Sequence, residues 1–280
     1  MVSSRRNAHS GKEDRMKKLI AIVMASLMLA ATCCGCSQKK DIVFPEDELL
    51  SEFTSTADKD MTVVSETDRV KNVNFYRGEE EIYTHIFVPE GDKTYPVVVI
   101  TVGLETPLFD CQAMAQTLSD NNIIGVIYDP SDSENRTALS MAADIESVVE
   151  GVAKLSCVDT NNIFLWGYDI GGISTAFVGF RNPDLIRGVI LAEPSLQLNK
   201  EIYDYMPDYN RNVIILEGNS IPSIGRNNPE AYARADELLP SCDLVQIPGA
   251  THTFEGSEFN SVVSHTIDFV NENLTLSYYW

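Results

Sequence analysis

The chain has 280 residues, 44% of them apolar, and a formal net charge of −20 at pH 7. This length favours one α/β domain with a single sizeable core over two domains. The acidic surface repels phosphate backbones, which argues against nucleic acid as a partner. No metal or nucleotide motif is visible, so we expect no cofactor. The scattered Cys111, Cys157 and Cys242 have no metal-type spacing and are interpreted as buried free thiols.

The first 35 residues have the features of an export signal. Met16, a possible true start, and two lysines precede the uncharged run 19–32, which is short for a bilayer span. The run ends in Cys-Cys-Gly-Cys, which resembles a bacterial lipoprotein signal. The resemblance implies a lipid anchor on Cys36 and a domain outside the cell membrane; the alternatives are a plainly secreted protein or an uncleaved anchor. Residues 36–68 are polar and acidic without periodicity, which predicts a flexible tether.

The rest of the chain, residues 69–280, alternates predicted strands and helices. Apolar and alternating runs predict strands over 70–76, 81–88, 96–102, 123–128, 163–166, 188–192, 213–216 and 244–247. Helical spacing of apolar residues predicts helices over 111–121, 137–154, 173–180, 229–239 and 258–274. Two antiparallel strands followed by strand–helix units predict a mostly parallel sheet of about eight strands with helices on both faces.

The segment around Asp169 contains the feature on which the function depends. A short apolar run is followed at once by Gly167-Tyr168-Asp169-Ile170-Gly171-Gly172 and then by residues that tolerate a helix. Strand, Gly-x-residue-x-Gly and helix is the layout of a nucleophile elbow. Its glycines permit a turn so tight that the central side chain is raised at the carboxyl end of the sheet. The central residue is usually Ser, whereas here it is Asp169.

A second motif, Gly249-Ala250-Thr251-His252-Thr253-Phe254, lies between the last predicted strand and the last predicted helix. With the elbow and the order of elements, it makes residues 70–275 resemble the α/β-hydrolase superfamily. The resemblance implies that His252 is the catalytic histidine. His85, on a predicted strand, and His265, on the last predicted helix, are interpreted as structural or exposed.

The resemblance gives two positions for a carboxylate partner of His252. The usual position follows the strand 213–216, but Ile221 stands there instead of Asp. The second position, at the end of the preceding strand, holds Glu193, which is our candidate, with Glu217 in reserve. The alternative is that Glu193 only begins a surface loop.

An Asp at the elbow is similar to that of haloalkane dehalogenases and epoxide hydrolases, which form an ester on this carboxylate and hydrolyse it with a His-activated water. A carboxylate is a competent nucleophile toward electrophilic carbon, and the amino end of the following helix stabilises its charge. Backbone N–H groups of Ile170 and Leu104 are the predicted oxyanion donors. His252, held by Glu193, is the predicted general base that activates water to hydrolyse the ester on Asp169.

Other features differ from those two families. Ile170 stands where they have Trp, Val102-Gly103 stands where they have His-Gly, and about 17 residues replace their helical cap. The short segment, 195–211, resembles the compact dienelactone-hydrolase and small-esterase branch, which has Ser or Cys at the elbow. The tyrosines of this segment, which we expect to be exposed rather than to reach a substrate, are Tyr203, Tyr205 and Tyr209.

Three functions are compatible with these residues. The first is a hydrolase of small esters or related electrophiles that forms a covalent bond to Asp169. In the second, Asp169 and His252 together activate a water without a covalent step. The third is a hydrolase-fold protein that has lost catalysis and binds a ligand or partner. Because this fold hosts many functions, the resemblance selects no substrate.

Overall fold

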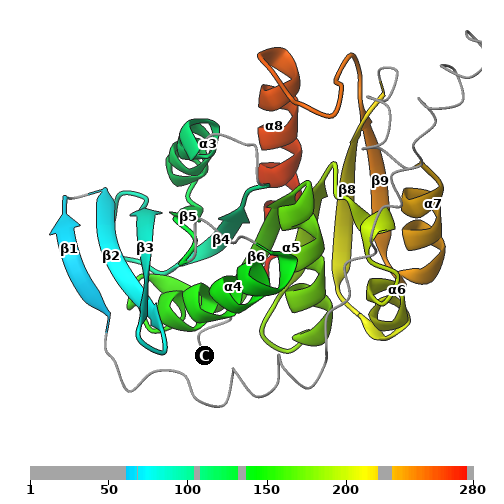
Figure 1. Ribbon diagram of the computed structural model, residues 1–280. Coiled ribbons are helices and arrows are strands. Elements are labelled where there is room, and N and C mark those ends of the chain that lie inside the picture. Colours follow the sequence, from blue (N-terminus) through cyan, green and yellow to red (C-terminus); the bar gives the residue numbers. More distant parts are fainter. Residues whose placement is uncertain (1–60, 68, 104–107, 132–136, 220–228, 276–280) are drawn as a thin grey trace, which may run out of the picture. The chain divides into compact units, whose positions relative to one another are not determined.

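The computed structural model describes residues 61–67, 69–103, 108–131, 137–219 and 229–275. In this part of the chain, nine strands form one sheet in the order β1-β2-β3-β5-β4-β6-β7-β8-β9 (Figure 1). The predicted lipidation site Cys36 and the predicted oxyanion donor Leu104 lie outside the described residues. No helix within those ranges is both long enough and apolar enough to cross a bilayer.

Neighbouring strands are antiparallel in the pairs β1–β2, β2–β3 and β3–β5. They are parallel in the pairs β5–β4, β4–β6, β6–β7, β7–β8 and β8–β9. Their bounds are β1 Thr62–Glu66, β2 Val70–Arg77, β3 Glu80–Phe87, β4 Tyr95–Thr101, β5 Ile124–Tyr128, β6 Val158–Tyr168, β7 Gly188–Ala192, β8 Asn212–Gly218 and β9 Cys242–Ile247. The mostly parallel sheet predicted from the sequence is therefore confirmed.

Strand β1 corrects two expectations. It lies inside the segment 36–68, for which a flexible tether was expected, and it adds a ninth strand where about eight were predicted. Its residues pair with β2, and all five of its side chains are exposed. A strand that buries neither face has no apolar periodicity, so the sequence contains no signal for it.

Helices cover both faces of the sheet. Helices α3 (Leu108–Asp120) and α8 (Ser257–Glu272) lie on one face, and α4 (Ala138–Val152), α5 (Ile170–Arg181) and α7 (Pro229–Leu238) on the other (Figure 1). Alternate residues of β4 enter the two cores: Val97 and Val99 one of them, Val98 and Ile100 the other. A strand covered on both faces must be apolar throughout, which is why the central strands could be predicted from continuous apolar runs.

The order of the central strands determines where a site can form. Strand β4 lies between β5 and β6 in the sheet. The chain therefore runs from β4 to β5 in one direction along the sheet, and then from β5 back past β4 to β6 in the other direction. In open parallel sheets, the crevice for ligands lies outside the carboxyl ends of the strands at such a reversal. Gly103 follows β4, Asp169 follows β6 and Glu193 follows β7, so all three lie at this edge.

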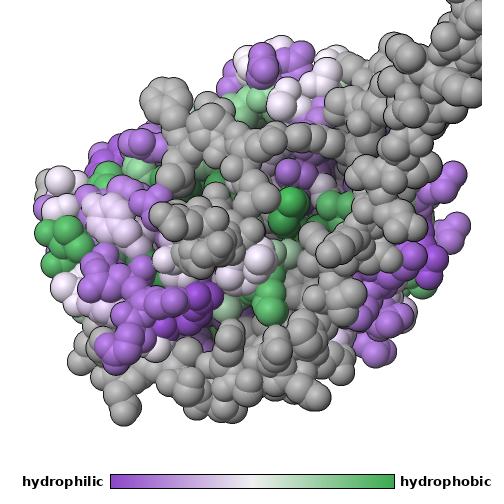
Figure 2. All heavy atoms as spheres, viewed as in Figure 1, coloured by the Kyte–Doolittle hydropathy of each residue, from purple (hydrophilic) through white to green (hydrophobic). Residues whose placement is uncertain are grey.

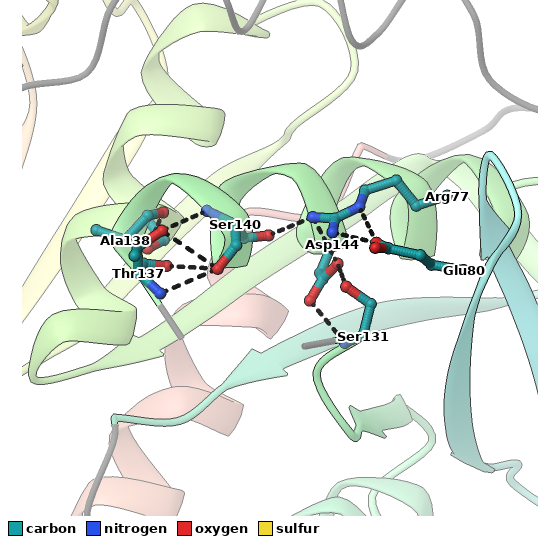
Figure 3. A network of polar contacts seen from close by, with 8 residues as sticks. Arg77, Glu80, Ser131, Thr137, Ala138, Ser140 and Asp144 are labelled. Atoms are coloured by element: carbon teal, nitrogen blue, oxygen red, sulfur yellow. Dashed lines mark hydrogen bonds and ion pairs between the residues drawn. The ribbon is translucent and has the colours of Figure 1, made fainter. Parts of the chain in front are cut away.

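A polar network joins the β2–β3 hairpin to α4 (Figure 3). Asp144, only 1% exposed, receives N–H and O–H bonds from Ser131 at 3.0 and 2.8 Å and faces Arg77 Nη1 at 3.2 Å. Arg77 also donates to the carbonyl oxygen of Ser140 at 3.1 Å and to Glu80. Burial raises the pKa of Asp144, and the bonds from Ser131 and the charge of Arg77 oppose that rise. The network fixes the start of α4 relative to the sheet.

On the face in Figure 2, hydrophilic residues predominate and hydrophobic ones form small, separate areas. The large hydrophobic residues that are exposed include Met61, Val63 and Val64 at β1, and Leu185 and Leu244 elsewhere. Such a surface agrees with the net charge of −20.

Glu146 on α4 makes the stability of the fold depend on pH. Asn182 donates to its carboxylate at 3.3 Å, but burial raises the pKa of Glu146 from 4.5 to about 7. Because the folded-state pKa exceeds the unfolded one, the contribution of Glu146 to the free energy of unfolding is most favourable below about pH 4.5. This contribution is lost as the pH rises through about 7, where the buried carboxyl group ionises. We expect Glu146→Gln to increase the free energy of unfolding at pH 8 by about 2 kcal/mol and to change it little at pH 4.

Urea denaturation at both pH values measures this difference. Glu237→Gln is the matched control, because Glu237 is an exposed glutamate on a different helix, α7. An equal effect of Glu146→Gln at pH 4 and pH 8 would contradict the expectation.

Candidate active site

Asp169 occupies a tight turn between β6, which ends at Tyr168, and α5, which begins at Ile170. Its backbone has φ 53° and ψ −121°, a conformation that non-glycine residues rarely adopt. The glycines of the turn have no room for side chains. A Cβ on Gly167 would lie 2.4 Å from the Thr175 hydroxyl, and one on Gly171 would lie 2.7 Å from a carbonyl oxygen of the neighbouring strand end. The structure therefore contains the elbow that the sequence predicts, with a carboxylate at its tip.

His252 lies between two carboxylates. It is 3% exposed and sits in the loop between β9 and α8. Its Nε2 is 3.7 Å from Asp169 Oδ1, and its Nδ1 is 3.5 Å from Glu193 Oε2. Tyr168 holds the loop by donating its O–H to the His252 carbonyl oxygen at 2.8 Å, and the two rings are 5.3 Å apart. The structure thus brings together the three residues that the sequence singled out.

Glu193 is buried and firmly held. It is 0% exposed, which excludes the alternative that it begins a surface loop. Its N–H donates to the Leu216 carbonyl oxygen at 2.9 Å, and its carboxylate accepts the Gly218 N–H and, at 3.3 Å, the Tyr232 O–H. These bonds orient the carboxylate toward His252.

The reserve candidate Glu217 faces a different neighbour. Its carboxylate accepts a 3.5 Å hydrogen bond from Gln246, and burial raises the pKa of Glu217. Within the described ranges it forms no ion pair with His252, whereas Glu193 does. Ile221, at the usual position of the acid, lies outside those ranges. The geometry therefore favours Glu193 as the partner of His252.

The predicted oxyanion donors are described in part. Ile170 is the first residue of α5, where a backbone N–H has no partner within the helix. Leu104 is not among the described residues, but Gly103 before it lies directly against the elbow. A Cβ on Gly103 would be 2.9 Å from Asp169 Cβ, so only glycine fits there.

Ser195 belongs to the site and was missed in the sequence. Its O–H donates to Asp169 Oδ1 at 2.5 Å, and its N–H donates to the Asp169 carbonyl oxygen at 3.1 Å. The sequence did contain one indication that Ser195 belongs to the site, because Ser195 follows Glu193 by two residues at the same edge of the sheet. Tyr232, which bonds Glu193, lies on α7 and has no comparable signal.

The segment 195–211 is short and packed rather than a mobile cap. It contains two 3-10 turns, η1 (Leu196–Leu198) and η2 (Met206–Asp208), and the helix α6 (Ile202–Tyr205). The expectation that its tyrosines are exposed was wrong. Tyr203 is 7% and Tyr209 0% exposed, and Tyr205 is half-buried. They fill the core beside α5 and α7 instead of projecting from the surface.

The remaining histidines and cysteines lie apart from this site. His85 bonds Asn72 at 2.8 Å on the antiparallel part of the sheet, and His265 is half-buried on α8. Cys111, Cys157 and Cys242 are free thiols as expected, but only Cys111 is fully buried. Within the described ranges, no cluster of side chains is arranged to hold a metal ion.

Comparison with known proteins identifies the fold. No family model and no curated protein matches the sequence. Among solved structures, Est1E from Butyrivibrio proteoclasticus matches with a TM-score of 0.64 and 17% identity over 72% of this chain and 98% of that chain. Dienelactone hydrolase from Anabaena variabilis matches with a TM-score of 0.62 and 15% identity over 74% and 99%. The chain has the α/β-hydrolase fold.

The site occupies the edge of the α/β-hydrolase fold where the parallel strands end. Asp169, His252 and Glu193 come from three separate loops at this edge, after β6, β9 and β7. A nucleophile, a base and an acid that orients the base are the parts that covalent hydrolysis needs. This arrangement can therefore support hydrolysis with Asp169 in the place of the nucleophile.

Proposed function

We propose that this protein is a hydrolase of small esters or related electrophiles that forms a covalent intermediate on Asp169. The observation that carries the proposal is the position of His252, with Nε2 3.7 Å from Asp169 and Nδ1 3.5 Å from Glu193. Dienelactone hydrolase and an Est1E structure with ferulic acid bound share the fold, which supports a small organic substrate.

The reaction has two steps. In the first, the carboxylate of Asp169 attacks an electrophilic carbon, and the bond to the leaving group breaks with its electron pair. In the second, His252 removes a proton from a water, which attacks the Asp169 carbonyl carbon. Glu193 stabilises the imidazolium that forms, and the N–H of Ile170 at the start of α5 is placed to stabilise negative charge.

Turnover in heavy-oxygen water tests this function, with p-nitrophenyl acetate and styrene oxide as probes of two electrophile classes. With styrene oxide, which forms an alkyl ester on Asp169, we expect the peptide that contains Asp169 to gain heavy oxygen, because the water oxygen remains on the carboxylate after hydrolysis. With p-nitrophenyl acetate the intermediate is a mixed anhydride, and only attack of water on the Asp169 carbonyl carbon labels Asp169. Asp169→Asn is expected to reduce turnover about 10³-fold or more. An enzyme that hydrolyses styrene oxide while its Asp169 stays unlabelled would instead use the direct activation of water by Asp169 and His252.

A second candidate is a protein that has lost catalysis and binds a ligand at this site. It is favoured by one observation: among the described residues, neither ring nitrogen of His252 has a partner at hydrogen-bond distance. This candidate predicts no turnover of either probe and no change on Asp169→Asn. Hydrolysis that disappears in Asp169→Asn would exclude it.

We also infer that the protein is exported and anchored through a lipid on Cys36, as the resemblance of its first residues to a lipoprotein signal indicates. Mass spectrometry of the chain from a membrane fraction tests this inference. A mature chain that begins at Cys36 and carries acyl groups supports it, and an unmodified chain contradicts it.

A further inference from the structure

The two carboxylate oxygens of Asp169 have different surroundings. Oδ1 accepts the Ser195 O–H at 2.5 Å and faces His252 Nε2 at 3.7 Å. Oδ2 lies toward Gly103, where an added Cβ would approach it to 3.1 Å. A hydrogen bond to a carboxylate oxygen stabilises its negative charge and makes it a weaker nucleophile. Oδ2, on the side of a residue without a side chain, is therefore the oxygen placed to attack a substrate carbon.

We propose that Ser195 is a catalytic residue that stabilises the oxyanion when the intermediate on Asp169 is hydrolysed. This role rests on the function proposed above. When the substrate carbon is bonded to Oδ2, Oδ1 is the carbonyl oxygen of the intermediate. Attack of water on the carbonyl carbon moves negative charge onto Oδ1, which the Ser195 hydroxyl already contacts at 2.5 Å. The bond becomes charge-assisted in the transition state and is stronger there than in the intermediate.

Ser195 is held in place before the reaction begins. The residue is 2% exposed, and its N–H donates to the Asp169 carbonyl oxygen at 3.1 Å. Pro194 packs against the first turn of α5, where a Cβ on Gly172 would lie 2.8 Å from Pro194 Cβ. The hydroxyl therefore needs no reorganisation to contact Oδ1. Donors that are fixed in advance are the ones that stabilise developing charge most effectively.

The proton and electron pairs balance without a further reactant. Water adds to the carbonyl carbon of the intermediate, and its proton moves to His252 Nε2. The tetrahedral species then collapses, the bond between the carbonyl carbon and Oδ2 breaks, and the departing oxygen takes the proton from His252. Asp169 is regenerated as a carboxylic acid with one oxygen from water, and it releases its remaining proton to solvent. Ser195 keeps its proton throughout and acts only as a hydrogen-bond donor.

The two steps can be timed separately in the full-length protein. Rapid mixing with p-nitrophenyl acetate and with styrene oxide, followed by acid quenching and mass spectrometry, measures formation and decay of modified Asp169. We expect Ser195→Ala to slow decay of the intermediate about 10²- to 10³-fold and to change its formation less than about fivefold. Modified Asp169 then accumulates in Ser195→Ala under steady turnover.

Two variants separate this role from a structural one. Ser195→Thr retains a hydroxyl and is expected to restore decay to within about tenfold of the natural rate. Ser174→Ala removes another buried hydroxyl, which bonds the Ala138 carbonyl oxygen at 2.8 Å rather than Asp169, and is expected to change neither step. Unchanged decay in Ser195→Ala, or equal slowing of both steps, would overturn the role of Ser195 alone. If Asp169 is modified by neither probe in the natural protein or in His252→Gln, the proposed function fails and this role fails with it.

Discussion

Replacing His252 by glutamine is expected to stop the reaction after the covalent intermediate has formed. The carboxylate of Asp169 attacks the substrate without help from a base, so the first step persists. Hydrolysis of the intermediate needs a base for water, and glutamine cannot accept that proton. We expect steady turnover to fall about 10³- to 10⁴-fold while about one covalent adduct per chain accumulates. Intact-protein mass spectrometry after mixing with p-nitrophenyl acetate or styrene oxide measures the adduct.

The choice of glutamine limits structural damage. His252 is buried, and its carbonyl oxygen, not its ring, accepts the bond from Tyr168, so that contact survives the substitution. His265→Gln is the matched control, because His265 lies on α8 and makes no contact with Asp169 or Glu193 among the described residues. A His252→Gln protein that turns over at the natural rate would show that the imidazole is not the base.

The sequence was sufficient for the elements whose burial follows a regular pattern. Strands such as β4 and β7 are continuous apolar runs because helices cover them on both sides, whereas α4 has apolar residues at helical spacing because one side of the helix packs on the sheet. Strand β1 could not be predicted, since none of its side chains is buried. Tyr209 could not be assigned to the core, because a chain that alternates short helices and 3-10 turns has no single period.

The candidate site was predictable where its residues follow strand ends. Asp169 and Glu193 come directly after parallel strands, whose carboxyl ends share one edge, so proximity follows from topology alone. The contacts of Ser195 and Tyr232 depend on side-chain directions after tertiary packing, which no local pattern encodes. The difference is between residues placed by the backbone of the sheet and residues placed by packing around it.

Glu193→Gln is expected to fold and to lose most of its activity. Glutamine has the shape of glutamate and retains an oxygen for the Gly218 N–H, but it lacks the negative charge that stabilises the imidazolium of His252. In catalytic triads, replacing the acid by its amide lowers kcat about 10⁴-fold, because the histidine is held in the wrong tautomer. We expect a loss of 10²- to 10⁴-fold in hydrolysis of the intermediate, again measured by rapid mixing and quenching.

The alanine variant and a neighbouring glutamate complete the test. Glu193→Ala leaves a buried N–H of Gly218 and O–H of Tyr232 without their acceptor, and we expect it to lower the free energy of unfolding by about 3 to 5 kcal/mol. Glu217→Gln changes the same chemical group at the end of the adjacent strand, where the carboxylate contacts Gln246 instead of His252, and its activity is expected to stay near that of the natural protein. If Glu217→Gln lost as much activity as Glu193→Gln, a diffuse effect of negative charge at this edge would explain both losses. Only an effect confined to Glu193 shows that the carboxylate acts through His252.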